Sequence, residues 1–153
     1  MEFTNDEKIN ILLEGLKERY NSIHIIRERA QSVSLWILGI LVAMSAWLFQ
    51  NFLIINFFDK ILISFVIFSI LLSVICLFFG DLEQGFKTQR EVASKIEEVL
   101  GFYGNNFFAD NYKSIYPEKW KNVNNGNFFV NNYLLILTGY LVFILTLFFN
   151  GCL

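Results

Sequence analysis

Three long apolar runs without a charged residue constrain this chain more than any other feature. They cover residues 33–49, 61–80 and 128–149. An α-helix rises about 1.5 Å per residue, so about 20 residues, with about 17 as the lower limit, cross the roughly 30 Å hydrocarbon core of a bilayer. The runs therefore predict an all-α integral membrane protein with three transmembrane helices, at about 32–52, 61–80 and 128–149.

A soluble protein with three buried helices is the alternative. The chain has 153 residues, of which 55% are hydrophobic and 17% are charged. The residues outside the runs are too few to cover three helices that are apolar on every side. We therefore expect the lipid bilayer to cover these helices.

The basic residues predict an orientation in the membrane. Of the twelve lysines and arginines, eleven precede the first run or lie between the second and third, and only Lys60 lies between the first and second. Cytoplasmic segments near transmembrane helices carry an excess of such residues. We therefore expect a multi-pass protein of the inner (plasma) membrane, with the N-terminus and residues 81–127 in the cytoplasm and the C-terminus outside.

The predicted cytoplasmic segments contain two amphipathic helices, because apolar residues recur there at spacings of three and four. The first occupies 1–31, and Thr4 with Glu7 has the form of a capping box at its start. The second runs from about Leu82 to Leu100, and Gly101 is expected to end it. An aromatic segment follows up to residue 127. The two helices form either a packed pair or a stalk that gates the membrane part. Their expected apolar seam consists of Leu12, Leu16, Ile23, Phe86, Ala93, Ile96 and Leu100.

Catalytic and metal-binding patterns are absent from the sequence. His24 is the only histidine, the cysteines Cys76 and Cys152 have no metal-site spacing, and no nucleotide-binding or hydrolase motif occurs. Glu97 and Glu98 are adjacent rather than on one helix face, so we expect both to be solvated surface residues. The net charge of −2 gives no basic surplus for nucleic acid. We expect no enzyme activity, no cofactor and no direct nucleic-acid binding.

The polar residues within the runs are small and uncharged, which disfavours an ion-coupled transporter. Three helices are too few to enclose a pathway, so a pore would require a homo-oligomer. Small residues let helices approach closely. The helix-packing or pore candidates are Gly39, Ala43, Ser64, Ser69 and Ser73. Trp120, Lys121 and Tyr133 are expected as anchors at the membrane interface.

The layout of the first hundred residues resembles a known family. An amphipathic helix ending in Ile26-Arg27-Glu28-Arg29, two apolar helices and the helix Leu82 to Leu100 are similar in order to SLATT-type and related two-helix membrane effectors of bacterial antiphage systems. The third apolar run departs from that two-helix pattern. The resemblance implies an oligomeric effector that forms or gates a pore when a partner protein or small ligand triggers it. A non-conducting scaffold subunit and a holin-like lysis protein are the alternatives.

Overall fold

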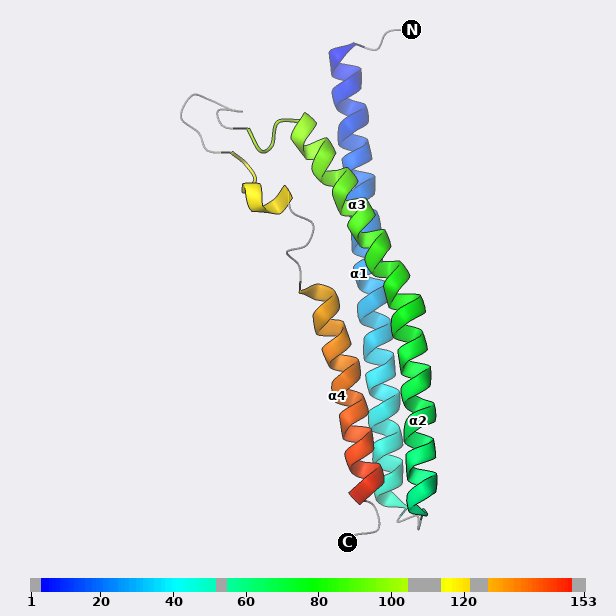
Figure 1. Ribbon diagram of the computed structural model, residues 1–153. Coiled ribbons are helices and arrows are strands. Elements are labelled where there is room, and N and C mark those ends of the chain that lie inside the picture. Colours follow the sequence, from blue (N-terminus) through cyan, green and yellow to red (C-terminus); the bar gives the residue numbers. More distant parts are fainter. Residues whose placement is uncertain (1–3, 52–54, 105–113, 122–126, 150–153) are drawn as a thin grey trace. The chain divides into compact units, whose positions relative to one another are not determined.

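The computed structural model describes residues 4–51, 55–104, 114–121 and 127–149, and every regular element within them is a helix (Figure 1). The all-α prediction is confirmed for these residues. The elements are α1 (Asn5–Gln50), α2 (Phe57–Ser73), the π-helix η1 (Val74–Phe79), α3 (Gly80–Val99), the 3-10 helix η2 (Glu118–Lys121) and α4 (Phe128–Phe149).

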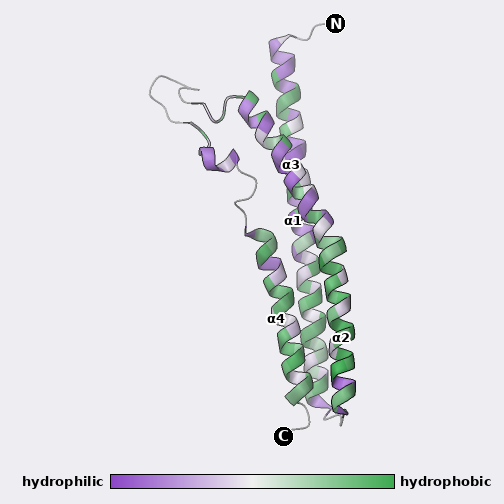
Figure 2. Ribbon diagram, in the orientation of Figure 1, coloured by the Kyte–Doolittle hydropathy of each residue, from purple (hydrophilic) through white to green (hydrophobic). Residues whose placement is uncertain are grey.

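Three helical stretches are long and apolar enough to cross a membrane: Asn5–Gln50, Phe57–Val99 and Phe128–Phe149. Figure 2 shows hydrophobic residues along α2, α4 and the second half of α1, and hydrophilic residues concentrated in α3 and the first half of α1. The first two stretches are longer than the apolar runs that they contain. In each, the helix includes both the apolar run and the adjoining amphipathic sequence.

No break separates the second apolar run from the amphipathic helix that follows it. Gly80 has helical dihedral angles (φ −58°, ψ −47°), and its N–H donates to the carbonyl of Ile75, five residues earlier, as in a π-helix. A glycine ends a helix when it adopts a positive φ. Gly101 does so, with φ 81°, just after α3.

The chain divides into two compact units, and two of the three boundaries between them fall within helices α1 and α3. We call Met1–Glu28 with Glu83–Gly126 the polar unit, and Arg29–Leu82 with Asn127–Leu153 the apolar unit. Helix α1 contributes to both. Residues 105–113 and 122–126 of the aromatic segment lie outside the described residues.

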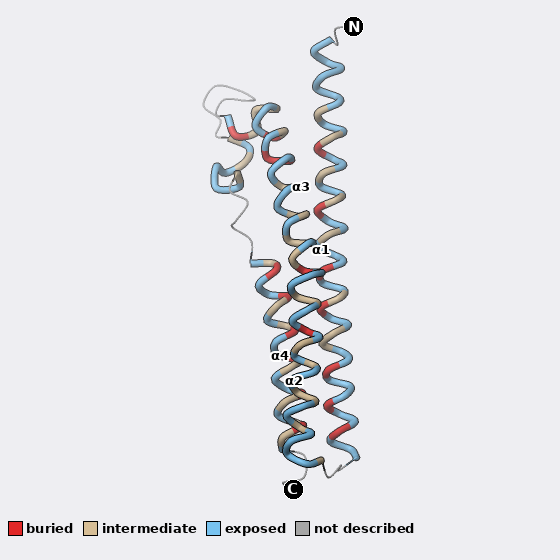
Figure 3. Tube along the Cα trace, turned by 45° about the vertical axis from the view of Figure 1, so that its right-hand side comes forward, coloured by how far each residue is buried: buried red, intermediate tan, exposed pale blue. Residues whose placement is uncertain are grey.

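Most of the core of the apolar unit lies along one side of α1 and one side of α4 (Figure 3), and Leu71 of α2 and Phe79 of η1 add to it. The buried residues of each helix recur at spacings of three, four or seven, as expected for a single helix face. In α1 they are Ala30, Ser34, Leu41, Ser45 and Leu48, and in α4 they are Phe129, Asn132, Ile136, Gly139, Phe143 and Leu147.

Among the described glycines, Gly139 has the closest neighbours, and these belong to α1. A methyl group on it would lie 3.0 Å from Cδ1 of Leu38 and 3.1 Å from Cδ1 of Leu41. Such distances are shorter than ordinary van der Waals contact, so the absence of a side chain permits the approach.

Helix α2 contacts α4 through polar and aromatic pairs. The hydroxyls of Ser64 and Tyr140 lie 3.1 Å apart, and the Phe57 and Phe148 rings meet edge to face at 6.1 Å. Lys60 Nζ donates to the carbonyl of Phe148 at 3.3 Å, near the C-terminus of α4 where a cation is favoured by the helix dipole. Leu71 is nevertheless the only buried residue of α2.

Candidate functional site

Helices α1 and α3 run antiparallel in the polar unit. A methyl group on Gly15 would lie 3.9 Å from Cδ1 of Ile96, and one on Gly85 would lie 3.7 Å from Cδ1 of Ile26. Leu16, Ile23 and Ala93 form the buried core between them. Phe86, Ile96, Leu100 and Phe102 pack against this core. Six of the seven expected seam residues therefore come together. Leu12 is half-buried outside the cluster, and Phe102 joins it unpredicted.

Glu97 is fully buried, so the prediction that it is a solvated surface residue is wrong. Glu98 is exposed, as expected, and pairs with Lys121 at 2.9 Å. The difference follows from helix geometry. Glu97 lies one turn after the buried Ala93 and therefore on the same side of α3, whereas Glu98 is rotated away from that side.

Both carboxylate oxygens of Glu97 accept hydrogen bonds. Oε1 accepts from the Tyr20 hydroxyl of α1 and from Arg90 Nη1 of α3, the latter at 2.8 Å. Oε2 accepts from the hydroxyl of Tyr103, in the turn after α3. We call Tyr20, Arg90, Glu97 and Tyr103 the Glu97 cluster. Burying a lone carboxylate costs several kcal/mol, and only such a set of donors offsets that cost.

The two tyrosines of the Glu97 cluster are held in their neutral form. Burial, and then the hydrogen bond to Glu97, raises the pKa of Tyr20 and of Tyr103 above the ordinary value of 10.0. Both hydroxyls therefore stay protonated at neutral pH and serve as donors. Since both carboxylate oxygens accept hydrogen bonds from other parts of the polar unit, Glu97 joins α1, α3 and the turn after α3.

The Glu97 cluster extends to the segment 114–121. Arg90 Nη2 donates to the carbonyl of Trp120 at 3.0 Å. The Tyr116 ring lies 5.4 Å from that of Trp120, and the Tyr116 N–H donates to the Phe102 carbonyl at 3.0 Å. Lys121 Nζ lies 5.0 Å from the centre of the Tyr103 ring, within cation–π range. Residues of α1, α3 and the turn after α3 thus meet at one buried carboxylate, and the segment 114–121 is attached to it through Arg90 and Tyr103.

The three expected interface anchors occupy different places. Trp120 is half exposed beside Tyr116, and Lys121 pairs with Glu98 in the polar unit. Tyr133 lies in the apolar unit, with its ring 5.7 Å from that of the fully buried Phe79. Their contact with lipid headgroups stays a prediction.

The five helix-packing candidates do not form one contact within the chain. Gly39 and Ala43 are exposed, and no atom lies within 4 Å of a methyl group placed on Gly39. Ser69 and Ser73 donate to carbonyls four residues earlier in their own helix. Ser64 pairs with Tyr140. Any role of Gly39, Ala43, Ser69 and Ser73 between copies of the chain stays a prediction.

Metal binding finds no support in the described part of the chain, where no three His, Cys, Asp or Glu side chains are grouped so that they could hold an ion. No protein-family model matches the sequence, and no curated protein or solved structure is significantly similar to it.

Proposed function

We propose that this protein is an oligomeric membrane effector that forms or gates a pore in the bacterial inner membrane, in a role such as antiphage defence. A partner protein or small ligand acting on the polar unit would trigger it. One observation carries the proposal: α1, and the continuous helix from α2 to α3, each contribute to both units without a break. A change in the α1–α3 seam therefore acts on the same helices that would cross the bilayer.

The composition of the apolar helices supports a pore over a transporter. Residues 33–49, 61–80 and 128–149 contain no charged side chain that could bind a coupling ion. Their exposed side chains include Trp36, Phe65 and Leu145, which suit contact with lipid or with other copies. One chain is too small to enclose a water-filled path, so the proposal requires assembly.

We propose that the polar unit is cytoplasmic and the C-terminus is outside, because ten of the twelve basic residues belong to the polar unit and an eleventh, Arg29, directly follows its first segment. Residues 150–153 lie outside the described residues. Alkaline phosphatase fused after Leu153 is expected to be active, since it folds only outside the cytoplasm, and a fluorescent protein fused there is expected to stay dark. The same reporters at the N-terminus serve as controls with the opposite pattern. Fluorescence from the Leu153 fusion would contradict the orientation.

The pore itself is tested by placing charges in the seam. Leu16 is buried and Ile96 packs beside it, so Leu16→Asp with Ile96→Asp should cost well above the roughly 1 kcal/mol of an ordinary substitution. A shift of a few kcal/mol is enough to populate an alternative state. We expect cells expressing this variant to lose membrane potential without any trigger, as followed with a potential-sensitive dye at matched membrane levels.

The matched control places the same charges on exposed positions of the same helices, Leu13→Asp with Val92→Asp. It should retain the potential of wild-type cells. If cells with the seam variant also retain their membrane potential, both uninfected and after phage infection, the scaffold function replaces the pore. If the wild type, the seam variant and the control variant all depolarise cells without a trigger, the protein is holin-like instead.

A further inference from the structure

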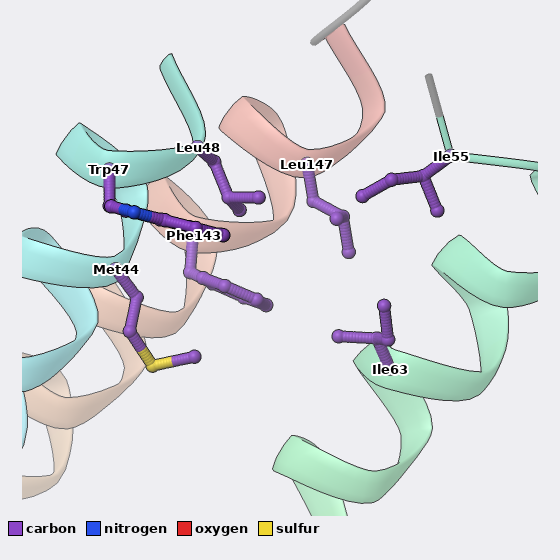
Figure 4. A pocket seen from close by; sticks show the side chains of 7 residues that line it. All are labelled: Met44, Trp47, Leu48, Ile55, Ile63, Phe143 and Leu147. Carbon is purple, nitrogen blue, oxygen red and sulfur yellow. The ribbon is translucent and has the colours of Figure 1, made fainter. Parts of the chain in front are cut away.

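Two adjoining cavities separate α1 from α2 in the apolar unit. One, of about 270 Å³, is lined by residues that include Trp47, Ile63, Phe143 and Leu147. The other, of about 310 Å³, is lined by residues that include Ile37, Ile67 and Val74. Met44 lines both, so we treat them as one α1–α2 slot. In Figure 4, side chains of α1 and α4 face Ile55 and Ile63 across an open space.

We propose that the α1–α2 slot binds the acyl chain of a membrane lipid. Every lining residue is apolar, and the exposed lining contains no polar atom. The slot is open on one side, since Ile40, Trp47 and Ile70 of its lining are also exposed, and an open apolar groove favours an apolar occupant. The inference depends on insertion of the apolar unit into a bilayer and is independent of whether the protein conducts ions.

The length of the slot fits one acyl chain. Its lining extends from Ile37 to Leu48 on α1 and from Ile63 to Val74 on the opposite side, which is about 17 Å on each at about 1.5 Å per residue. One leaflet supplies about half of the roughly 30 Å hydrocarbon core. Leu48 lies two residues before the end of α1, so the slot occupies the leaflet at the Gln50 end of that helix.

A second copy of the chain fits the slot less well than a lipid does. A helix with its side chains is about 10 Å across, so a second copy could place only single side chains in the slot and would leave most of its length unfilled. Close approach of helix backbones requires small residues, whereas the slot is lined by Ile, Leu, Val, Met, Phe and Trp. Gly39 and Ala43, the small exposed residues of α1, do not line it. Neither restriction applies to a single flexible hydrocarbon chain.

The slot also explains why α2 is the least buried of the apolar helices. Leu71 is its only buried residue, whereas α4 buries six. Ser64 and Phe68 of α2 contact Tyr140 and hold α2 beside α4. The slot remains between α2 and α1. An acyl chain would supply the missing packing partners along this face.

Met44 provides a native position for the test. The sequence has two methionines, Met1 and Met44, so a diazirine methionine analogue places one photoreactive group in the slot. The full chain is reconstituted in phosphatidylcholine vesicles, illuminated and digested. We expect the peptide containing residue 44 to carry the mass of one phospholipid. Retention in the vesicles after an alkaline wash reports insertion separately.

Two tryptophan variants of adjacent residues distinguish the slot from the general lipid surface. Ile67→Trp fills the slot, whereas Val66→Trp adds the same bulk to an exposed position outside its lining. The lipid adduct should fall at least about tenfold in Ile67→Trp, equivalent to about 1.4 kcal/mol, and persist in Val66→Trp. Equal labelling of both variants would show ordinary bilayer contact and overturn the proposal. Covalent dimers formed through residue 44 would overturn it in favour of a second copy.

Discussion

Glu97→Ala is expected to lower the free energy of unfolding of the polar unit by about 3–5 kcal/mol, the usual cost of removing one partner of a buried ion pair. The substitution leaves Arg90 Nη1 and the hydroxyls of Tyr20 and Tyr103 without their acceptor. It also opens a cavity next to Ala93, which is itself fully buried. All three segments joined by the Glu97 cluster should loosen together.

Hydrogen–deuterium exchange of the full chain in detergent or nanodiscs measures this effect. A loss of 3–5 kcal/mol corresponds to roughly 150-fold to several-thousand-fold faster exchange of the amides of α1 and α3 that open with the polar unit. Glu98→Ala is the matched control, because its pair with Lys121 lies at the surface and contributes at most about 1 kcal/mol. If both variants exchange equally fast, the Glu97 cluster does not hold the polar unit together.

The helices could be predicted from the sequence because their signals are local. Apolar runs report transmembrane length, and the capping box at Thr4 is present as expected, with the Thr4 N–H donating to Glu7 Oε2 at 2.8 Å and the Glu7 N–H donating to Thr4 Oγ1 at 3.4 Å. The continuity through Gly80 was harder to predict. Glycine permits both helical and positive φ values, and only the surrounding chain decides between them.

Glu97 escaped prediction because its partners are distant in sequence. Tyr20 lies 77 residues away, and no local pattern pairs the two. A carboxylate is almost never fully buried unless paired, so exposure is the ordinary expectation. The available signal was its position one turn after Ala93, on the side of α3 that faces the apolar seam.

The small residues of the apolar helices illustrate a second limit. Sequence spacing selected Gly39 with Ala43, but the close approach within the chain occurs at Gly139. A glycine in a transmembrane run can contact lipid, another copy of the chain or another helix of the same chain. The sequence around the glycine is similar in all three cases. Only the register between α1 and α4 identifies which one is needed for packing.

Gly139→Leu should therefore destabilise the apolar unit, whereas Gly39→Leu should not. A side chain at 139 meets Leu38 and Leu41 at 3.0–3.1 Å already at its first carbon, so the remaining carbons must push α4 away from α1. Overpacking of this kind costs about 1–3 kcal/mol. The ratio of unfolded to folded protein should rise about fivefold to 150-fold.

A titration of the full chain from mild detergent into SDS, followed by tryptophan fluorescence, measures the change. Of the three tryptophans, Trp47 lines the slot together with Phe143 and Leu147 of α4, so its share of the emission changes when α1 separates from α4. Gly39→Leu adds the same side chain where nothing lies within 4 Å, and its midpoint should match that of wild type. Equal midpoints for all three proteins would show that the Gly139 contact is not needed for stability. Because Gly39 is exposed, a smaller particle size for Gly39→Leu with an unchanged midpoint would locate a contact between copies at Gly39, separate from the fold of one chain.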